Sequence, residues 1–291
     1  MRGLEKLHPV TELCYFAGVM SIGMLSLHPA LIALSLLGCT VLLLLQGRMS
    51  LRTAAAGILI FLLMSLLNPL FYHDGVTVLF VINDRPFTLE AFLYGMAASG
   101  MIVGMIGWFR LLSGMLTSDK LMYLLGGISP SFALTVSMAL RFVPLFARQG
   151  ERIHRAQLGL GLYRDENLPD AAAGRAREFS ILTTWALENG VITADSMAAR
   201  GYGTGRRTRY AIFRFTRADA AFLSVSLILT AAALWGIFGG SLRFEYYPEI
   251  TLPEHSLLAQ AAMAAYGMLC LLPVLAEGGE RIQWHCLRSK I

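Results

Sequence analysis

The sequence predicts an all-α, polytopic helical membrane protein with about six transmembrane helices and a cytoplasmic insert that carries two long helices. Hydrophobic residues make up 56% of the 291 residues and charged residues only 15%, with a mean hydropathy of +0.59. Soluble globular chains carry about 25% charged residues. The apolar residues also form long blocks without Asp, Glu, Lys or Arg. In a bilayer only helices and closed barrels satisfy every backbone hydrogen bond, and blocks this long indicate helices.

The blocks place the individual helices, because a transmembrane helix needs about 20 apolar residues. The first block, Leu13–Gly47, has 35 residues without a charge, which is too long for one helix and suits two with a break at His28-Pro29. Its charged N-terminal flank resembles a secretory signal, but the block is too long for one and we expect it to be retained. The predicted spans are residues 10–27, 29–46, 54–72, 89–109, 218–240 and 256–276.

The distribution of Lys and Arg orients these spans, because cytoplasmic loops are enriched in both residues. With both termini inside, the two larger external loops hold only Arg85 and Arg243, and 22 of the 24 basic residues lie on the cytoplasmic side. A further apolar run at 121–140 is interrupted by "GGISPS". A span there would place thirteen arginines, from Arg141 to Arg217, outside. We therefore place 121–140 inside, against the membrane or the bundle.

Three regions follow: helices 1–4 in 1–110, an insert in 111–216, and helices 5–6 with a cytoplasmic tail in 217–291. The insert holds two helical patterns. The first has a mostly apolar stripe at steps of three and four, formed by Phe142, Leu145, Phe146, Gln149, Ile153, Ala156 and Leu160. Off this stripe, Glu151 precedes Arg155 by four residues, a spacing that favours an ion pair. The second pattern covers about 175–200, after a turn-rich stretch in which Pro169 and Gly174 are expected to interrupt a helix. Asn189-Gly190 is a candidate kink.

Two residues interrupt the apolar run "SMALRFVPLF". Arg141 is either a functional charge within the membrane or an interfacial arginine that extends to the lipid headgroups. Pro144 is assigned the same structural, interfacial role. The four cysteines show no paired spacing, so we interpret them as unreactive thiols and expect no metal site and no bound cofactor.

The stretch "ADSMAARGYGTGRRTR" is unusually polar and small for this chain. Ala199, Arg200 and Gly201 are expected to end the second helix, with glycine in the left-handed position after the cap. The small residues and the rigid guanidinium suit docking into a groove of a partner protein; a plain C-cap with an arginine that complements the helix dipole is the alternative. The later glycines do not form a phosphate-binding loop, because the chain has no Walker sequence. We therefore do not expect it to hydrolyse ATP itself.

Several stretches together resemble the transmembrane (T) component of energy-coupling factor (ECF) transporters, importers of vitamins and metal ions in bacteria and archaea. They are "LHPVTEL", "TLEAFLYGM", "LRFVPLF" followed by "RIHRAQ", and "DSMAARGYGTGRRT". The resemblance covers nearly the full length and keeps the order of the pieces. "SMAARGYG" is the most specific of them.

The resemblance implies a non-enzymatic coupling subunit in the plasma membrane of a prokaryote. Its partners would be two ABC-type ATPase subunits that use ATP, one small membrane-embedded substrate-binding subunit for a vitamin or a cobalt or nickel ion, and no nucleic acid. Two cytoplasmic coupling helices would each seat an Ala-Arg-Ser/Gly motif in a groove on one ATPase. The second motif maps onto Ala199, Arg200 and Gly201. The membrane-facing side of the insert, with Phe142, Leu145, Phe146 and Ile153, would be the platform for the substrate-binding subunit.

The first coupling motif departs from the family pattern. The pattern Ala-Gln-x-Ala-Arg-Gly aligns with Ala156 to Gly161, so Gly159 and Leu160 stand where alanine and arginine are expected. Either Arg155 or Arg164 supplies the charge, or the first contact is mainly apolar. The asymmetry fits two different ATPases.

Two other classes compete with the coupling subunit. A self-contained secondary transporter usually shows inverted repeats and polar residues at mid-membrane, whereas the clear spans here lack acidic residues and no repeat is visible. An intramembrane enzyme needs a nucleophile and base, or metal ligands, facing a cavity. The six histidines fall at expected helix ends or in loops, and no His-Glu-x-x-His sequence occurs. Co-purification with ATPase subunits would separate the three classes.

Overall fold

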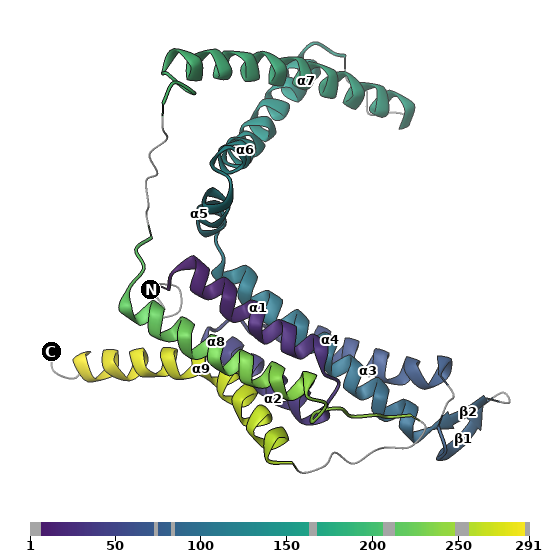
Figure 1. Cartoon of the computed structure of the whole chain (residues 1–291). Helices are drawn as coiled ribbons and strands as arrows, with labels where there is room; N and C mark the ends of the chain where they lie inside the picture. Colours follow the sequence, from purple (N-terminus) through teal and green to yellow (C-terminus); the bar gives the residue numbers. More distant parts are fainter. Residues whose placement is uncertain are drawn as a thin grey trace. The chain divides into compact units, whose positions relative to one another are not determined.

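The computed structural model describes residues 7–72, 75–82, 85–162, 168–205, 213–247 and 256–288. Within these ranges the chain forms nine α-helices and one antiparallel pair of strands (Figure 1). The chain divides into two compact units. Residues 1–120 and 213–291 form what we name the bundle unit, and residues 121–212 form the insert unit.

The bundle unit contains six long helices at the positions of the six predicted spans. They are α1 Pro9–Leu25, α2 Pro29–Leu45, α3 Leu51–Phe71, α4 Leu89–Met115, α8 Arg217–Phe238 and α9 Leu257–Arg288. Among the described residues, five helices are long and apolar enough to cross a membrane: α3, α4, α8, α9 and, in the insert unit, α6. The all-α class is therefore confirmed, and the five apolar helices indicate a membrane protein. The count of six spans is not confirmed, because α1 and α2 have 17 residues each.

Two His-Pro pairs begin α1 and α2. The Nδ1 atom of His8 accepts a hydrogen bond from the backbone N–H of Val10 at 3.3 Å, and Nδ1 of His28 accepts one from Ala30 at 3.2 Å. Proline follows at the first helical position, where its fixed φ and missing N–H cost nothing. Burial lowers the pKa of His28, which favours the neutral ring that this acceptor role requires. The predicted break at His28-Pro29 is confirmed.

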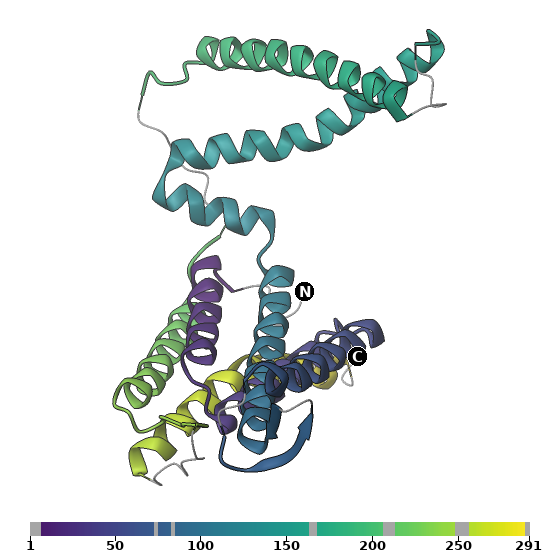
Figure 2. The ribbon, with the colours of Figure 1, turned by 90° about the vertical axis from the view of Figure 1, so that its right-hand side faces the viewer.

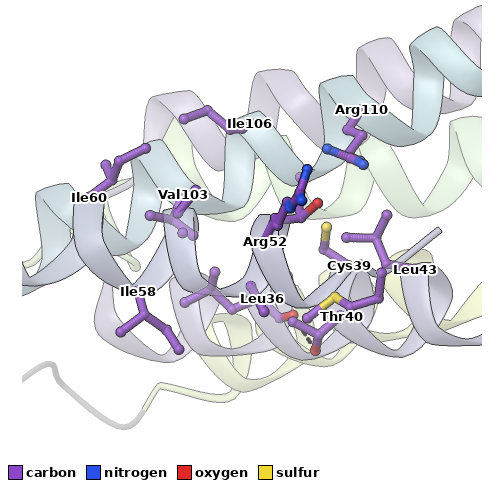
Figure 3. Close-up of a pocket in the computed structure, with 16 residues that line it drawn as sticks. Leu36, Cys39, Thr40, Leu43, Arg52, Ile58, Ile60, Val103, Ile106 and Arg110 are labelled. Carbon is purple, nitrogen blue, oxygen red and sulfur yellow. Dashed lines mark hydrogen bonds between the residues drawn. The ribbon is translucent and has the colours of Figure 1, made fainter.

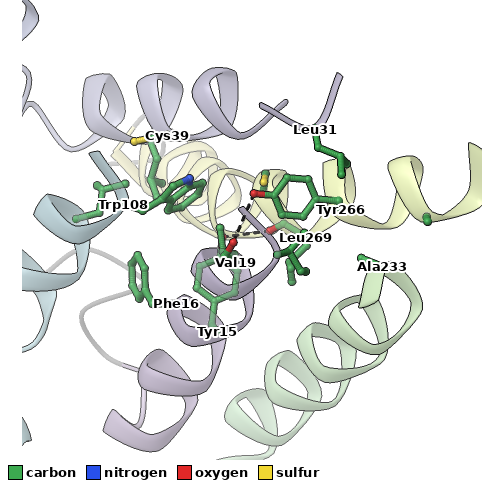
Figure 4. Close-up of a cluster of buried hydrophobic side chains, with 14 of the residues drawn as sticks. Tyr15, Phe16, Val19, Leu31, Cys39, Trp108, Ala233, Tyr266 and Leu269 are labelled. Atoms are coloured by element: carbon green, nitrogen blue, oxygen red, sulfur yellow. Dashed lines mark hydrogen bonds between the residues drawn. The ribbon is translucent and has the colours of Figure 1, made fainter. Parts of the chain in front are cut away.

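Aromatic and aliphatic side chains from α1, α2, α4, α8 and α9 form the core of the bundle unit (Figure 4). Trp108 is fully buried and donates a hydrogen bond from Nε1 to Ser35 Oγ at 2.9 Å. The hydroxyl of Tyr15 donates to the Leu269 carbonyl at 3.1 Å. Helix α8 approaches α1 closely at Gly18, where an added Cβ would lie 2.6 Å from the Thr230 hydroxyl oxygen. Small residues at such contacts are typical of membrane helices.

Polar bonds join the helix ends that the charge pattern assigns to one side of the membrane. Asp219 in the first turn of α8 accepts from the backbone N–H of His8 at 2.9 Å, and Gln46 after α2 donates to Glu277 on α9 at 3.3 Å. Lys120 forms a buried ion pair with Glu12 on α1. The ends of α1, α2, α8 and α9 named here therefore lie on one side of the bundle, as the alternation of spans predicts.

The opposite side carries the strands β1 Val78–Ile82 and β2 Arg85–Thr88, which pair in antiparallel fashion. The charge pattern of the sequence predicts only an external loop here. The carboxylate of Glu90 in the first turn of α4 accepts from the backbone N–H of Thr77 at 3.1 Å and so holds the hairpin to this helix. On the same side, the Tyr246 hydroxyl donates to the Leu27 carbonyl at 2.8 Å. Burial and the neighbouring Tyr94 raise the pKa of Tyr246 to about 12.

The insert unit consists of most of α5 (Ser118–Ile128), together with α6 (Pro130–Gly159) and α7 (Leu168–Ala199). Figure 2 shows α6 and α7 crossing near the end of α6 and the start of α7, and diverging from there. The expected interruption by Pro169 and Gly174 is wrong, because α7 already begins at Leu168. Proline is favoured in the first turn of a helix, and Gly174 is a buried residue within α7. Helix α7 also continues through Asn189-Gly190.

Candidate docking site: two capped helix ends

Helix α7 ends in a glycine-capped turn at the predicted residues. Gly201 has a φ of +80°, in the left-handed region. Its N–H donates to the Ala198 carbonyl at 3.0 Å, and the N–H of Tyr202 donates to Met197 at 3.0 Å. This pair of bonds is the Schellman motif, which satisfies two of the last helical carbonyls. The predicted role of Gly201 as the residue after the cap is confirmed.

Helix α6 ends in the same motif. Gly161 has a φ of +67°, its N–H donates to Leu158 at 3.1 Å, and the N–H of Leu162 donates to Gln157 at 3.1 Å. Position by position, Gly159, Leu160 and Gly161 therefore take the places of Ala199, Arg200 and Gly201. The alignment of the two motifs drawn from the sequence thus has a matching backbone geometry.

The caps by themselves do not identify a docking site, because α2 ends in the same way. Gly47 has a φ of +63°, and Gly47 and Arg48 donate to Leu44 and Leu43. The cap residue there, Gln46, is buried at 2% exposure. In contrast, Leu160 is 73% exposed and Arg200 is also exposed. The insert unit therefore presents its two cap side chains outward, whereas α2 turns its cap inward.

Side-chain contacts hold α6 to α7 near their crossing. The rings of Phe146 and Trp185 meet edge to face with centroids 5.9 Å apart. His154 Nδ1 lies 2.5 Å from Glu178 Oε1. Arg177 donates to the Leu162 carbonyl at 3.4 Å, a bond from α7 to the turn that ends α6. None of these pairs is predicted from the sequence, because each joins residues whose proximity depends on how the helices cross.

The predicted platform residues do not all point the same way. Ile153 is buried at 8% exposure, Phe146 packs on Trp185, and Phe142 stacks on Phe146 with centroids 5.6 Å apart. Leu145 is 38% exposed. The predicted stripe is therefore shifted: Ala156 and Leu160 face outward, and Gln157 is buried in their place. The inner edge follows steps of mostly four residues, which one helix face produces.

Four further apolar side chains on the described part of α7 are more than half exposed. Ile192 lies on the apolar edge that the second helical pattern shares with Glu188, whereas no role for Phe179, Leu187 or Val191 is predicted from the sequence. Their exposed fractions are 71% for Phe179, 68% for Leu187, 62% for Val191 and 58% for Ile192. So much exposed apolar surface on one helix is typical of a face covered by a protein or a membrane.

Of the two arginines proposed to supply the charge at the end of α6, Arg155 lies within the described residues and Arg164 does not. Arg155 forms the predicted ion pair with Glu151, with Nη2 and Oε1 3.2 Å apart, and both side chains are about two-thirds exposed. That prediction is confirmed. Arg164 lies outside the described residues, as do Arg206 and Arg207 of the glycine-rich stretch. Arg141 and Pro144 are exposed on α6, which otherwise reads as one continuous helix.

The side chains at these helix ends offer hydrogen-bond donors at one end and apolar surface at the other. Arg200 offers a permanently charged fork of donors, and Leu158, Leu160 and Leu162 offer an apolar surface with exposed fractions of 49%, 73% and 51%. Among the residues that the structure describes, no group of three or more His, Cys, Asp or Glu side chains is arranged to hold a metal ion.

No family model matches the chain. Over 125 residues the chain is 34% identical to a Mycoplasma pneumoniae protein named "Uncharacterized protein MG181 homolog". The match covers 42% of this chain and 28% of the relative's length. The chain thus corresponds to less than a third of that protein, whose name states no activity.

Proposed function

We propose that this chain is a transmembrane coupling subunit of an ECF-type importer. It would sit in the plasma membrane of a prokaryote with both termini inside, and transmit motion from two ATP-hydrolysing subunits to a separate substrate-binding membrane subunit. The cargo would be a vitamin or a transition-metal ion chosen by that subunit.

The observation that carries this proposal is the exposed Arg200 on the glycine-capped end of α7. The long helix α7 gives such a contact the stiffness to transmit a displacement, since its 32 residues extend about 48 Å at 1.5 Å per residue. The capped turn fixes the backbone around the guanidinium. A partner groove with carboxylates or carbonyls would therefore meet a pre-organised donor rather than a mobile side chain on a frayed end.

The difference between the two ends supports a pair of non-identical ATPases. A socket that accepts Leu160 has to be apolar, whereas a socket that accepts Arg200 has to supply acceptors. One ATPase type could not satisfy both equally, because an arginine socket left facing leucine keeps unpaired buried acceptors. Helix α6 would dock on one ATPase and α7 on the other.

The substrate-binding subunit would cover the outward apolar side chains of the insert unit. Leu145 of the predicted platform remains exposed for this role, and Phe179, Leu187 and Val191 of α7 extend the same kind of surface. Ile153 would act from inside, by holding α6 on α7 and so positioning Leu145.

Co-purification tests the proposal. The full chain is co-expressed with the ABC ATPases encoded in the same genome, solubilised in mild detergent and isolated through a tag on the chain. We expect two ATPase polypeptides to be retained, and Arg200→Ala to release one of them while the membrane fraction of the chain is unchanged. Substrate uptake by the chain reconstituted alone would instead indicate a secondary transporter and would refute the proposal.

A further inference from the structure

A groove of about 620 Å³ opens in the bundle unit between α2, α3 and α4 (Figure 3). Leu36 and Leu43 of α2, Ile58 and Ile60 of α3, and Val103 and Ile106 of α4 line it. Ile58 and Ile106 are 61% and 50% exposed, so the groove is open along its side. A cleft of this size and apolarity fits a small ligand better than bulk water.

Along the helix axes, the groove extends over most of the thickness of one membrane leaflet. Its lining runs from Leu36 to Leu43 on α2, from Arg52 to Ile60 on α3 and from Val103 to Arg110 on α4. At 1.5 Å per residue these segments extend roughly 10–12 Å. Half of a hydrocarbon core of about 30 Å is roughly 15 Å. An acyl chain that enters from one membrane surface would therefore be covered over most of its own leaflet.

Positive charge is gathered at one end of the groove. Figure 3 shows Arg52 and Arg110 at this end, with Ile58 and Ile60 toward the other. Both arginines are exposed, and no acidic residue lines the groove. Neither guanidinium has an ion-pair partner among the described residues. Arg52 also lies in the first turn of α3, where the helix dipole adds partial positive charge.

A second groove on the same helices gives an internal comparison. It measures about 280 Å³ and lies toward the other ends of α3 and α4, lined by Leu67, Phe71 and Ile102 among others. Its polar lining residues are Asn68, Tyr72 and Ser99, and it has no charged residue. Apolar grooves thus occur at both ends of this helix pair, but only the larger one combines an apolar track with two cations.

We propose that the larger groove binds one anionic phospholipid. Its phosphate would lie between Arg52 and Arg110, and one acyl chain would lie along Leu36, Ile58, Val103 and Ile106. The lipid would come from the leaflet on the side where α3 begins and α4 ends. Arginine pairs recognise phosphate through fixed forks of donors, and basic pockets between transmembrane helices are suited to anionic headgroups. This inference requires only that the bundle spans a membrane, so it stands apart from the proposed coupling function.

Lipid competition on the full chain tests the proposal. Delipidated protein in detergent is incubated with equal amounts of phosphatidylglycerol and phosphatidylcholine that carry the same acyl chains, and bound lipid is counted by native mass spectrometry. We expect roughly a 30-fold preference for phosphatidylglycerol, because each arginine near the headgroup contributes about a factor of five to ten. Equal retention of both lipids would overturn the proposal.

Matched variants locate the site. Arg52→Gln with Arg110→Gln should remove the preference, whereas Arg214→Gln with Arg217→Gln removes the same charge from exposed positions outside the groove and should leave it. Ala56→Phe keeps both arginines but fills the groove from an exposed lining residue, and should reduce lipid retention at least tenfold. If the glutamine pair does not fold, Arg52→Lys with Arg110→Lys retains the charge and should keep the preference.

The remaining outcomes each decide against the proposal. Displacement of the lipid by millimolar inorganic phosphate would show a simple anion site instead of a lipid site. An unchanged preference in the glutamine pair would remove the role of the two arginines. Cross-linking from position 56 in native membranes to a helix of another membrane protein, in place of lipid, would show a protein-docking groove.

Discussion

The ends of α6 and α7 share one backbone design and differ in the side chain that it presents. Both helices close with a left-handed glycine and the same two hydrogen bonds, at Gly161 and at Gly201. The residue before the glycine is an exposed leucine in α6 and an exposed arginine in α7. The turn therefore determines where a side chain is displayed, and the residue in the cap position determines what it can bind.

The largest expected effect comes from exchanging the two displayed side chains. Arg200→Leu should weaken binding of the ATPase at the α7 end about 30-fold or more, since a desolvated arginine contact is often worth about 2 kcal/mol. Leu160→Arg should weaken binding of the other ATPase, at the α6 end, because it buries an unpaired charge. Affinities of the reconstituted chain for each purified ATPase measure both effects.

The matched control for this exchange is Arg152→Leu, which removes an exposed arginine from α6 away from either cap. We expect it to leave both affinities within twofold. The double variant combines Leu160→Arg with Arg200→Leu. If it exchanged the two ATPases between α6 and α7, the side chain at the cap position alone would determine which ATPase groove binds each helix. If neither single variant changed an affinity, both turns would be plain helix caps.

A smaller effect is expected from the glycines that the two ends share. Gly201→Ala and Gly161→Ala place a Cβ in the left-handed region and should each destabilise the last helical turn by about 1–2 kcal/mol. Gly159→Ala and Gly190→Ala, which lie within helices with no atom within 4 Å of an added Cβ, should instead stabilise by about 0.5–1 kcal/mol. Amide hydrogen exchange in the helical turn around each substitution measures these opposite signs. Similar protection in all four variants would contradict the left-handed geometry.

The aromatic contact between α6 and α7 should contribute less free energy of folding than either glycine cap. A double-mutant cycle with Phe146→Leu and Trp185→Leu should give a coupling free energy of about 0.5–1.5 kcal/mol for the edge-to-face pair. Thermal unfolding of the purified chain in detergent supplies the four stabilities. A coupling near zero would mean that the helices separate in solution. Phe179→Leu, at an exposed ring of α7, serves as the control for loss of an aromatic residue.

The smallest effect is expected at the ion pair on the surface of α6. Arg155→Gln should destabilise by only about 0.3–0.5 kcal/mol, because Glu151 and Arg155 are both largely exposed. Glu151→Gln removes the same ion pair and should destabilise the chain by a similar amount. An ATPase affinity that fell much further in Arg155→Gln than in Glu151→Gln would show that Arg155 supplies the charge missing at position 160, and would weaken the contrast between the two ends.

The parts of the fold that were predictable depend on local signals. Charge-free blocks located all six bundle helices, the His28-Pro29 pair located a break, and Gly201 located a cap, because each is decided within a few residues. The helix starts at Pro130 and Leu168 are not predicted from the sequence, because the prolines there indicate interruptions by pattern although proline is compatible with a first helical turn. The hairpin at 78–88 was also missed, since the short strands lie in a stretch read only as a connecting loop.

The parts that were not predictable depend on which helices become neighbours. Ile153 was assigned to an outward platform from its place on an apolar stripe, but the crossing with α7 buries it together with Gln157. The groove brings together Arg52 and Arg110, which are more than 50 positions apart in sequence. Their separate positions were visible in the sequence as basic residues at helix ends, yet nothing local indicated that they share one cleft.

The chain leaves the bundle unit at Lys120 and returns to it at Phe213. Just before the exit, Lys120 is bonded to Glu12, and just after the return, Asp219 accepts from the backbone of His8. Both junctions are thus fixed to adjacent turns of α1. We therefore expect both anchors to persist when the segment after α5 is lengthened, shortened or exchanged, since Glu12, Lys120, His8 and Asp219 all lie in the bundle unit.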